Sequence, residues 1–145
     1  MWRRQNKTNH ITIDSHAPTA LAGFWNEALS WGGLAAAPDD GRASCGPAEG
    51  GTVYLEFVRV REAKTVKNRL HFGCSVGSID AFDSEFERLI ALGATLGWRE
   101  EFGPDVDPHY RNWVLLDPEG NEFCLGGGEW PDGMESPSEV PISLP

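Results

Sequence analysis

The sequence predicts an α+β fold built from two βαβββ modules, and three observations support this prediction. Two stretches, HITIDS at 10–15 and RLHFGCSV at 69–76, place apolar residues at alternate positions after a histidine, as a strand with one buried face does. A helix-like segment follows each stretch. The offset between His10 and His71, 61 residues, equals that between Gly32 and Gly93. Such an internal repeat defines the architecture, and it predicts a strand, helix and stop of equal length in each copy.

The first module is predicted over about residues 10–61. After the first strand, Pro18 suits a first helical turn, and Gly32 and Gly33 stop the helix. Its apolar stripe consists of Leu21, Phe24, Trp25, Ala28 and Leu29. Three strands are then predicted, at 34–37, weakly at 42–45, and strongly at 52–60.

The second module is predicted over about residues 69–126. Ser78 is a good N-cap for its helix, which Gly93 stops, and the apolar residues between them recur at helical spacing. The strands expected after it lie at 94–99, 110–116 and 121–125, and a DPEG type I turn joins the last two. Because one helix covers one face of four strands, the two sheets are expected to form a curved, partly open cup with the helices outside.

The segments outside the modules are polar. Residues 1–9 are expected to be flexible, and 127–145 form a tail rich in proline, glycine and acidic residues. The linker at 62–70 carries Lys64, Lys67 and Arg69 in an otherwise acidic chain, either as a solvated connector or as a rim for an anionic ligand.

Composition narrows the class of protein. With 145 residues, 40% of them hydrophobic, the chain is long enough for one domain with a real core. A net charge of −10 argues against nucleic acid and anionic membranes as partners. No apolar run is long enough for a membrane span, and none follows the basic N-terminus as in a signal peptide, so a cytoplasmic location is expected. The three cysteines lack CxxC spacing and are predicted to be reduced thiols, with Cys74 in the core.

Strand alternation also predicts which residues face the inside of the cup. They include His10 and His71 on the first strands, Glu56 and Glu122 on the last strands, and their neighbours Thr12, Asp14, Gly73, Ser75, Tyr54, Val58 and Cys124. Two histidines and a carboxylate suit a divalent metal, here His10, Glu56 and His71. Trp31, Trp98 and Trp113 are either core or pocket wall. The predicted ligand-binding residues are Thr12, Tyr54, Trp113 and Cys124.

Four stretches resemble the glyoxalase/bleomycin-resistance/extradiol-dioxygenase superfamily, which has the vicinal oxygen chelate fold. They are HITIDSHAPTALAGFWNEALSW, KTVKNRLHF, RLIALGAT and WVLLDPEGNEFCL. Within the superfamily the chain is most similar to glyoxalase-like domain proteins, from about His10 to Gly126. The resemblance implies a cup of paired modules, often in a homodimer. It also implies metal ligands at His10, Glu56 or Val58, His71 and Cys124, where Cys124 replaces the glutamate of metal-dependent glyoxalases.

Three functions follow as hypotheses. The first is a protein that sequesters a small aromatic or antibiotic-like compound in the cup, where acidic groups would suit a cationic ligand. The second is a metal-dependent lyase, isomerase or dioxygenase that uses zinc, nickel, iron or manganese, with Glu56 or Glu122 as base. The third is a domain without metal that has a structural or partner role. The sequence leaves open whether the modules pair within one chain or between chains.

Overall fold

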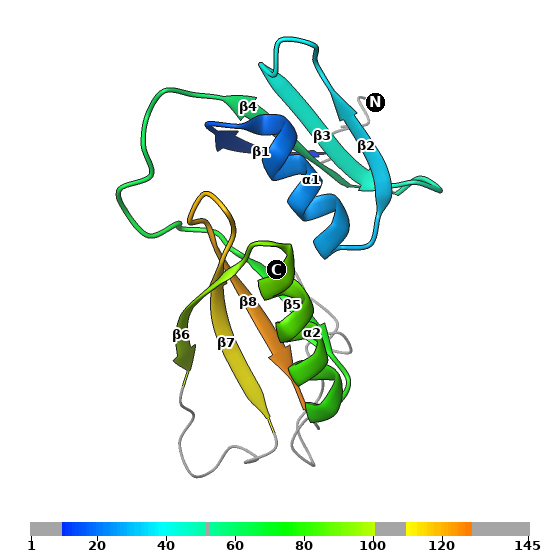
Figure 1. Cartoon of the computed structure of the whole chain (residues 1–145), viewed down its shortest axis with the longest axis vertical. Helices are drawn as coiled ribbons and strands as arrows, with labels where there is room; N and C mark the ends of the chain where they lie inside the picture. The colour runs from blue at the N-terminus through cyan, green and yellow to red at the C-terminus, as the bar shows by residue number, and fades with distance from the viewer. Residues whose placement is uncertain (1–9, 52, 101–109, 129–145) are drawn as a thin grey trace, which may run out of the picture. The chain divides into compact units, whose positions relative to one another are not determined.

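The computed structural model describes residues 10–51, 53–100 and 110–128, and within them two modules have the same order of elements. Each module has four strands and one helix, and Figure 1 labels these elements. Module one comprises β1 (His10–Ser15), α1 (Pro18–Ala28), β2 (Gly32–Ala36), β3 (Arg42–Pro47) and β4 (Tyr54–Arg59). Module two comprises β5 (Phe72–Val76), α2 (Ile79–Leu92), β6 (Thr95–Glu100), β7 (Arg111–Leu116) and β8 (Glu122–Gly127).

The chain divides into two compact units that follow the modules with one exchange. The first unit runs to Lys67 and also takes the β7–β8 turn, Asp117–Asn121, while the second holds the rest. The predicted α+β class and the two βαβββ modules are confirmed. Among the described residues, no helix is long and apolar enough to cross a membrane.

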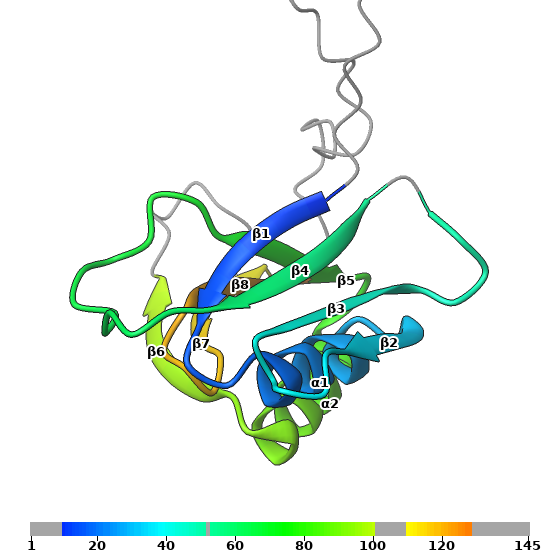
Figure 2. The same ribbon diagram turned by 90° about the horizontal axis from the view of Figure 1, so that it is seen from above.

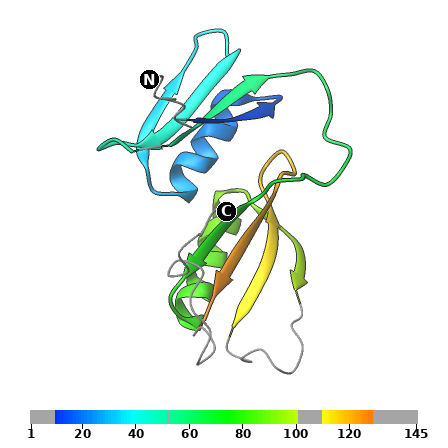
Figure 3. The same ribbon diagram turned by 180° about the vertical axis from the view of Figure 1, so that it is seen from behind.

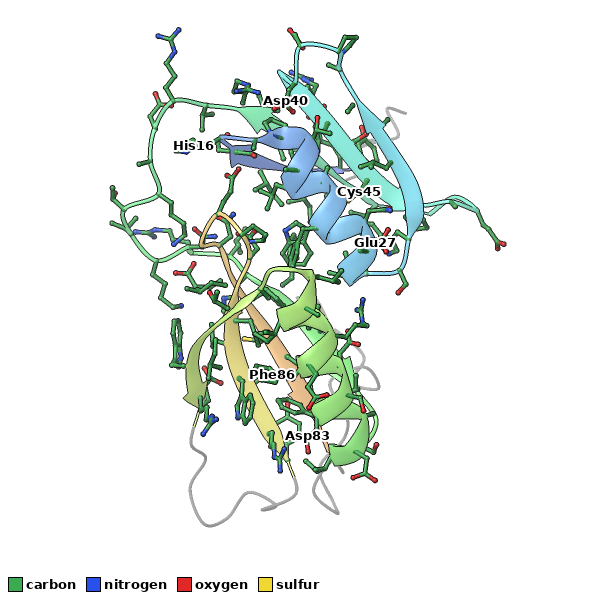
Figure 4. All side chains as sticks on the ribbon, viewed as in Figure 1. His16, Glu27, Asp40, Cys45, Asp83 and Phe86 are labelled. Carbon is green, nitrogen blue, oxygen red and sulfur yellow. The ribbon has the colours of Figure 1, made fainter. Side chains whose placement is uncertain are left out.

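The sheet of module one has the strand order β1-β4-β3-β2. β1 runs parallel to β4, and the other neighbours are antiparallel. Helix α1 lies along one face of this sheet, as Figure 2 shows from above. The core between helix and sheet is mostly apolar, and Cys45 of β3 belongs to it (Figure 4). Its other buried members include Leu21, Trp25, Leu55 and Phe57.

The sheet of module two repeats this topology in the order β5-β8-β7-β6, seen from behind in Figure 3. Phe82 and Phe86 of α2 meet Trp113 of β7 edge-on, with ring centroids 4.9 and 5.0 Å from that of Trp113. Figure 4 labels Phe86 on the helix. Aromatic rings prefer this T-shaped contact to a face-to-face sandwich. Phe123 and Leu125 of β8 are fully buried on the same side.

The two helices differ in length, which corrects the prediction of equal copies. They start at Pro18 and Ile79, with the predicted offset, but α1 has 11 residues and α2 has 14. Both end in a Schellman motif, in which the last amides bond back to earlier carbonyls. In α2 its left-handed residue is Gly93 (φ 116°), whereas in α1 it is Ser30 (φ 53°). A serine in that conformation is uncommon, so the sequence predicted that the first helix would end at the later glycines, Gly32 and Gly33.

The three cysteines are free thiols, as predicted, but their burial differs from the prediction. Cys45 is fully buried, while Cys74 is only partly buried. Cys74 points to the helix side but lies on β5, which is an edge strand of its sheet and leaves one flank uncovered.

Candidate functional site

The open face of the module-one sheet gathers polar side chains from three strands. Thr12 of β1 lies beside Glu56 of β4, and Ser44 of β3 flanks Glu56 on its other side. Because alternate residues of a strand share a face, His10, Arg42 and Tyr54 belong to this face as well. The intervening residues, Leu55 and Phe57, are buried on the opposite, helix-covered face.

The carboxylate of Glu56 is bonded through both oxygens. Its Oε1 accepts a hydrogen bond from Nη1 of Arg42 at 2.9 Å, and its Oε2 accepts one from Oγ1 of Thr12 at 3.3 Å. Nε2 of His10 lies 3.9 Å from the same Oε2. The Glu56 side chain is 17% exposed and that of Arg42 is 62% exposed. Glu56 is therefore held in place, with its charge met by an arginine at the surface.

Next to this group, the rings of His10 and Tyr54 stack. Their centroids are 5.4 Å apart and their planes are inclined by 28°. Gly46, the neighbour of Tyr54 on β3, makes room for the pair, since a Cβ at this glycine would lie 2.9 Å from the Cβ of Tyr54. The backbone thus leaves space for an aromatic residue at position 54.

The open face of the module-two sheet has a different set of groups. Glu122 is 8% exposed, and its Oε2 accepts the backbone amide of Asn68 at 3.0 Å. Cys124 lies beside Gly73 and is partly buried, and His71 is exposed just before β5. In both sheets the first and last strands run parallel and side by side. At equivalent positions, Glu56 lies beside Thr12 in module one, whereas Cys124 lies beside Gly73 in module two.

Tyr110 is a residue of this second face that the sequence did not single out. A Cβ at Gly126 would lie 3.0 Å from its phenol oxygen, so that glycine leaves space for the ring. Burial raises the pKa of Tyr110, and Cys124 and Glu100 in their ionised forms add to the effect. The phenol therefore stays neutral and able to donate a hydrogen bond.

Trp113 and Trp98 lie on opposite faces of the second sheet. Trp113 is packed against α2 and has the guanidinium of Arg99 4.5 Å from its ring centroid, so it is on the helix side, away from Cys124. Trp98 pairs with Val114, which itself neighbours Cys124, so Trp98 is on the open face and is 40% exposed. The structure thus brings Trp98, not Trp113, to the face of Cys124.

Module one has two neighbouring side chains that could bind a metal ion, His10 and Glu56. His10 Nε2 and Glu56 Oε2 approach each other, but the second oxygen of Glu56 is paired with Arg42. In the part of the chain that the structure describes, no three His, Cys, Asp or Glu side chains form a group that could hold a metal ion. Since zinc takes three or four protein ligands, the His10–Glu56 pair is not a metal site by itself.

A buried carboxylate in the β7–β8 turn organises the first unit. Asp117 is 3% exposed and accepts hydrogen bonds from Nε1 of Trp25 (3.1 Å), the amides of Glu119 and Asn121 (2.9 Å each) and the side chain of Asn121. Burial raises the pKa of Asp117, and these hydrogen bonds oppose the shift. The sequence showed the turn, but it gave no sign that the turn packs against α1.

Glu119, in the same turn, serves the start of α1. The N-cap residue of that helix, Ala17, has no side chain that could cap it, and its first turn has no acidic residue. The carboxylate of Glu119 accepts the amides of His16 (3.0 Å) and Ala17 (2.8 Å) and the hydroxyl of Ser15 (2.8 Å). The amides of His16 and Ala17 precede the first helical residue, and the first amide within the helix, that of Thr19, donates to Oδ1 of Asp40 at 2.8 Å. Glu119 thus adds negative charge and acceptors to a helix N-terminus that Asp40 also serves.

The family model of the glyoxalase-like domain matches residues 10–126. The chain belongs to this family. A comparison with curated proteins gives no match.

Solved structures of related folds agree with the family. A glyoxalase/bleomycin resistance protein/dioxygenase from Nocardioides is 16% identical, with a TM-score of 0.63 over 97% of this chain and 93% of that one. A family enzyme of the same description from Burkholderia phytofirmans is 18% identical, with a TM-score of 0.60 over 84% and 98%. A lactoylglutathione lyase from Agrobacterium tumefaciens is 13% identical, with a TM-score of 0.54 over 83% and 92%. At these identities the likeness shows the fold.

Proposed function

We propose that this glyoxalase-like chain binds a small aromatic or antibiotic-like compound on the open face of its module-one sheet and holds it without converting it. The observation that carries the proposal is the stacked pair of His10 and Tyr54. Both rings remain accessible, with exposures of 41% for the His10 side chain and 37% for Tyr54. Exposed rings beside a few fixed polar groups are what a small planar ligand needs for contact area and orientation.

The state of Glu56 favours binding over chemistry at this face. A general base must reach the proton that it removes, with an oxygen available for it. Both Glu56 oxygens are engaged, one by Arg42 and one by Thr12. Its role in the proposal is to hold Arg42 and Thr12 in fixed positions beside the rings.

A thermal-shift screen of the whole chain against small aromatic compounds tests the proposal, followed by calorimetry of the compounds that stabilise it. A ligand that binds only the folded state raises the apparent stability. Tyr54→Ala is expected to weaken binding at least 10-fold, because the ring platform is lost. Leu34→Ala is the matched control, since Leu34 is a 50% exposed side chain on β2 of the same sheet. If no compound stabilises the chain, or if Tyr54→Ala binds as wild type does, the proposal is wrong.

The second candidate is a metal-dependent lyase, isomerase or dioxygenase. It is favoured by the approach of His10 Nε2 to Glu56 Oε2, which presents two ligand types to a divalent ion. His71 is the proposed third ligand and Glu122 the proposed base, and the ion would supply a Lewis acid. Glu122 would first have to release the amide of Asn68, which it now accepts.

Metal analysis after incubation with zinc, nickel, iron or manganese separates the two candidates. Stoichiometric metal that is lost in both His10→Ala and His71→Ala supports the enzyme. His16→Ala is the control, because His16 is an exposed histidine of module one whose Nε2 contacts the backbone oxygen of Glu62 (Figure 4). Retention of the metal in all three variants would place it elsewhere and remove this candidate.

A further inference from the structure

The charge of the ligand can be inferred from Arg42, if the proposed binding at the module-one face holds. Arg42 lies on β3 beside Val58, on the same face as Glu56. Its Nη1 reaches Oε1 of Glu56, and 62% of its side chain remains exposed. A guanidinium has five N–H donors in a planar fork, so a single hydrogen bond to Glu56 leaves the group with donor capacity toward solvent.

Glu56 presents little negative charge to a ligand on this face. Its side chain is 17% exposed, and its oxygens are bonded to Arg42 and Thr12. A cationic ligand would have to displace the arginine from Oε1, which would leave two positive groups competing for one carboxylate. The outward-facing groups are instead the guanidinium and the two stacked rings.

We propose that Arg42 is a specificity-determining residue that makes this face select aromatic ligands bearing a carboxylate over aromatic ligands bearing an ammonium group. The ring of such a ligand lies against His10 and Tyr54, and its carboxylate takes the N–H donors of Arg42 that Glu56 does not use. Arginine and carboxylate match in geometry, because two parallel hydrogen bonds form between them.

Two effects oppose the selection of a carboxylate-bearing ligand. We expect both to be weaker than the direct interaction of that carboxylate with Arg42. The net charge of −10 repels anions, but salt screens charges beyond about 8 Å at physiological ionic strength, whereas Arg42 acts within hydrogen-bonding distance. A cationic ligand would gain a cation–π contact with Tyr54, but it would approach the guanidinium at the same time.

The experiment measures the affinities of a matched pair of probes, 2-naphthoate and 2-naphthylmethylammonium, for the full chain by NMR titration. The wild type is expected to bind the naphthoate about 10-fold more tightly. Arg42→Gln is expected to remove this preference, and Arg42→Lys to keep part of it. Arg59→Gln is the control, because Arg59 is also an exposed arginine paired with a carboxylate, that of Asp40, but lies on the other face of β4.

The outcomes distinguish this inference from the proposed function. A wild type that prefers the ammonium probe or binds both equally, with Tyr54→Ala abolishing binding, overturns the role of Arg42 and leaves the ring platform intact. An unchanged preference in a folded Arg42→Gln protein also overturns it. If neither probe binds, nor any compound of the wider screen, the proposed function fails and this inference fails with it.

Discussion

The two modules have the same order and pairing of strands, but they differ in nearly every side chain on the open faces of their sheets. Each has a parallel pair of first and last strands at one side of a four-stranded sheet, with a helix on one face. On the open face, module one places a carboxylate, Glu56, beside Thr12, and module two places a thiol, Cys124, beside Gly73. The repeat therefore keeps the pattern of residues that pack against each helix, while the residues on the other face of each sheet differ between the modules.

The modules also differ in how their helices begin. Helix α2 is capped from within, because Oγ of Ser78 accepts the amide of Ala81 at 3.1 Å. At helix α1, Asp40 accepts the amide of Thr19, and Glu119 from the distant β7–β8 turn accepts that of Ala17. Module one is thus the less self-contained of the two, and mutations in that turn should affect the first unit most.

The largest effect is expected from Asp117→Ala. It would leave the indole N–H of Trp25 and two backbone amides without an acceptor in a buried site, at a cost of about 3–5 kcal/mol in the free energy of unfolding. Asp83→Ala is the matched control in module two, since Asp83 is an exposed aspartate on α2 paired with Arg111 (Figure 4), and it should cost below about 1 kcal/mol. Urea unfolding of both variants measures the difference. Equal losses would contradict the special role of the turn.

The next largest effect is a fall in the free energy of unfolding at high pH. It should come from one thiol in each module, Cys45 in the first and Cys74 in the second. Burial raises the pKa of Cys45 and of Cys74 from 9.0 to about 11, with Glu85 adding to the shift at Cys74. In the unfolded chain these thiols ionise near pH 9, so between pH 9 and 11 the unfolded state binds fewer protons and stability falls as the pH rises. Two pKa units correspond to about 2–3 kcal/mol per thiol by pH 11.

Urea unfolding between pH 8 and pH 11 checks this prediction. Cys45→Ala and Cys74→Ala should each remove part of the decline, while their stabilities at pH 8 serve as references for the packing that is lost. An equal decline in wild type and in both variants would assign it to other groups.

The caps provide a closer comparison of the modules. Glu119→Ala should cost about 1–2 kcal/mol, because it removes the acceptor of two amides and a hydroxyl at α1. Ser78→Ala should cost about 1 kcal/mol at α2. Hydrogen exchange then locates each loss, which should appear at the start of the affected helix. A loss at α2 in Glu119→Ala would show that the turn does not serve module one alone.

The last effect concerns metal affinity and not stability, and it is expected for zinc binding to Arg42→Gln. Removal of the guanidinium frees Oε1 of Glu56 and eliminates a like charge beside the ion, so the affinity for zinc should rise on the order of 10-fold over wild type. Calorimetric titration measures the change, and the double variant Arg42→Gln with His10→Ala should lose it. An unchanged affinity would mean that Arg42 does not compete with a cation at this carboxylate.

The strands, the modules and the helix starts were predictable because they follow from local patterns. The first strand was predicted at His10–Ser15, where β1 lies, and the buried faces of β4 and β8 follow the alternation at Leu55, Phe57, Phe123 and Leu125. The end of α1 was not predictable, because Ser30 takes a conformation that favours glycine.

The candidate site was only partly predictable, because alternation assigns a face and not a partner. It placed Thr12, Tyr54 and Glu56 on one face, but the pairing of Glu56 with Arg42 required the register of β3, which was a weak strand in the sequence. The sequence signal for this strand was the alternation of the polar Arg42 and Ser44 with the less polar Ala43 and Cys45. The position of Trp113 depended on its packing against α2, which strand periodicity does not report.

The capping of α1 by Glu119 has a consequence for biosynthesis. The helix starts at Pro18, about a hundred residues before its capping carboxylate. At roughly 5–20 residues per second, the interval between synthesis of residue 61 and residue 119 is roughly 3–12 s. During that time the start of the helix has Asp40 but lacks Glu119, and the indole of Trp25 lacks the acceptor of Asp117. The first half of the polypeptide therefore has to wait for the second before it can reach its native state.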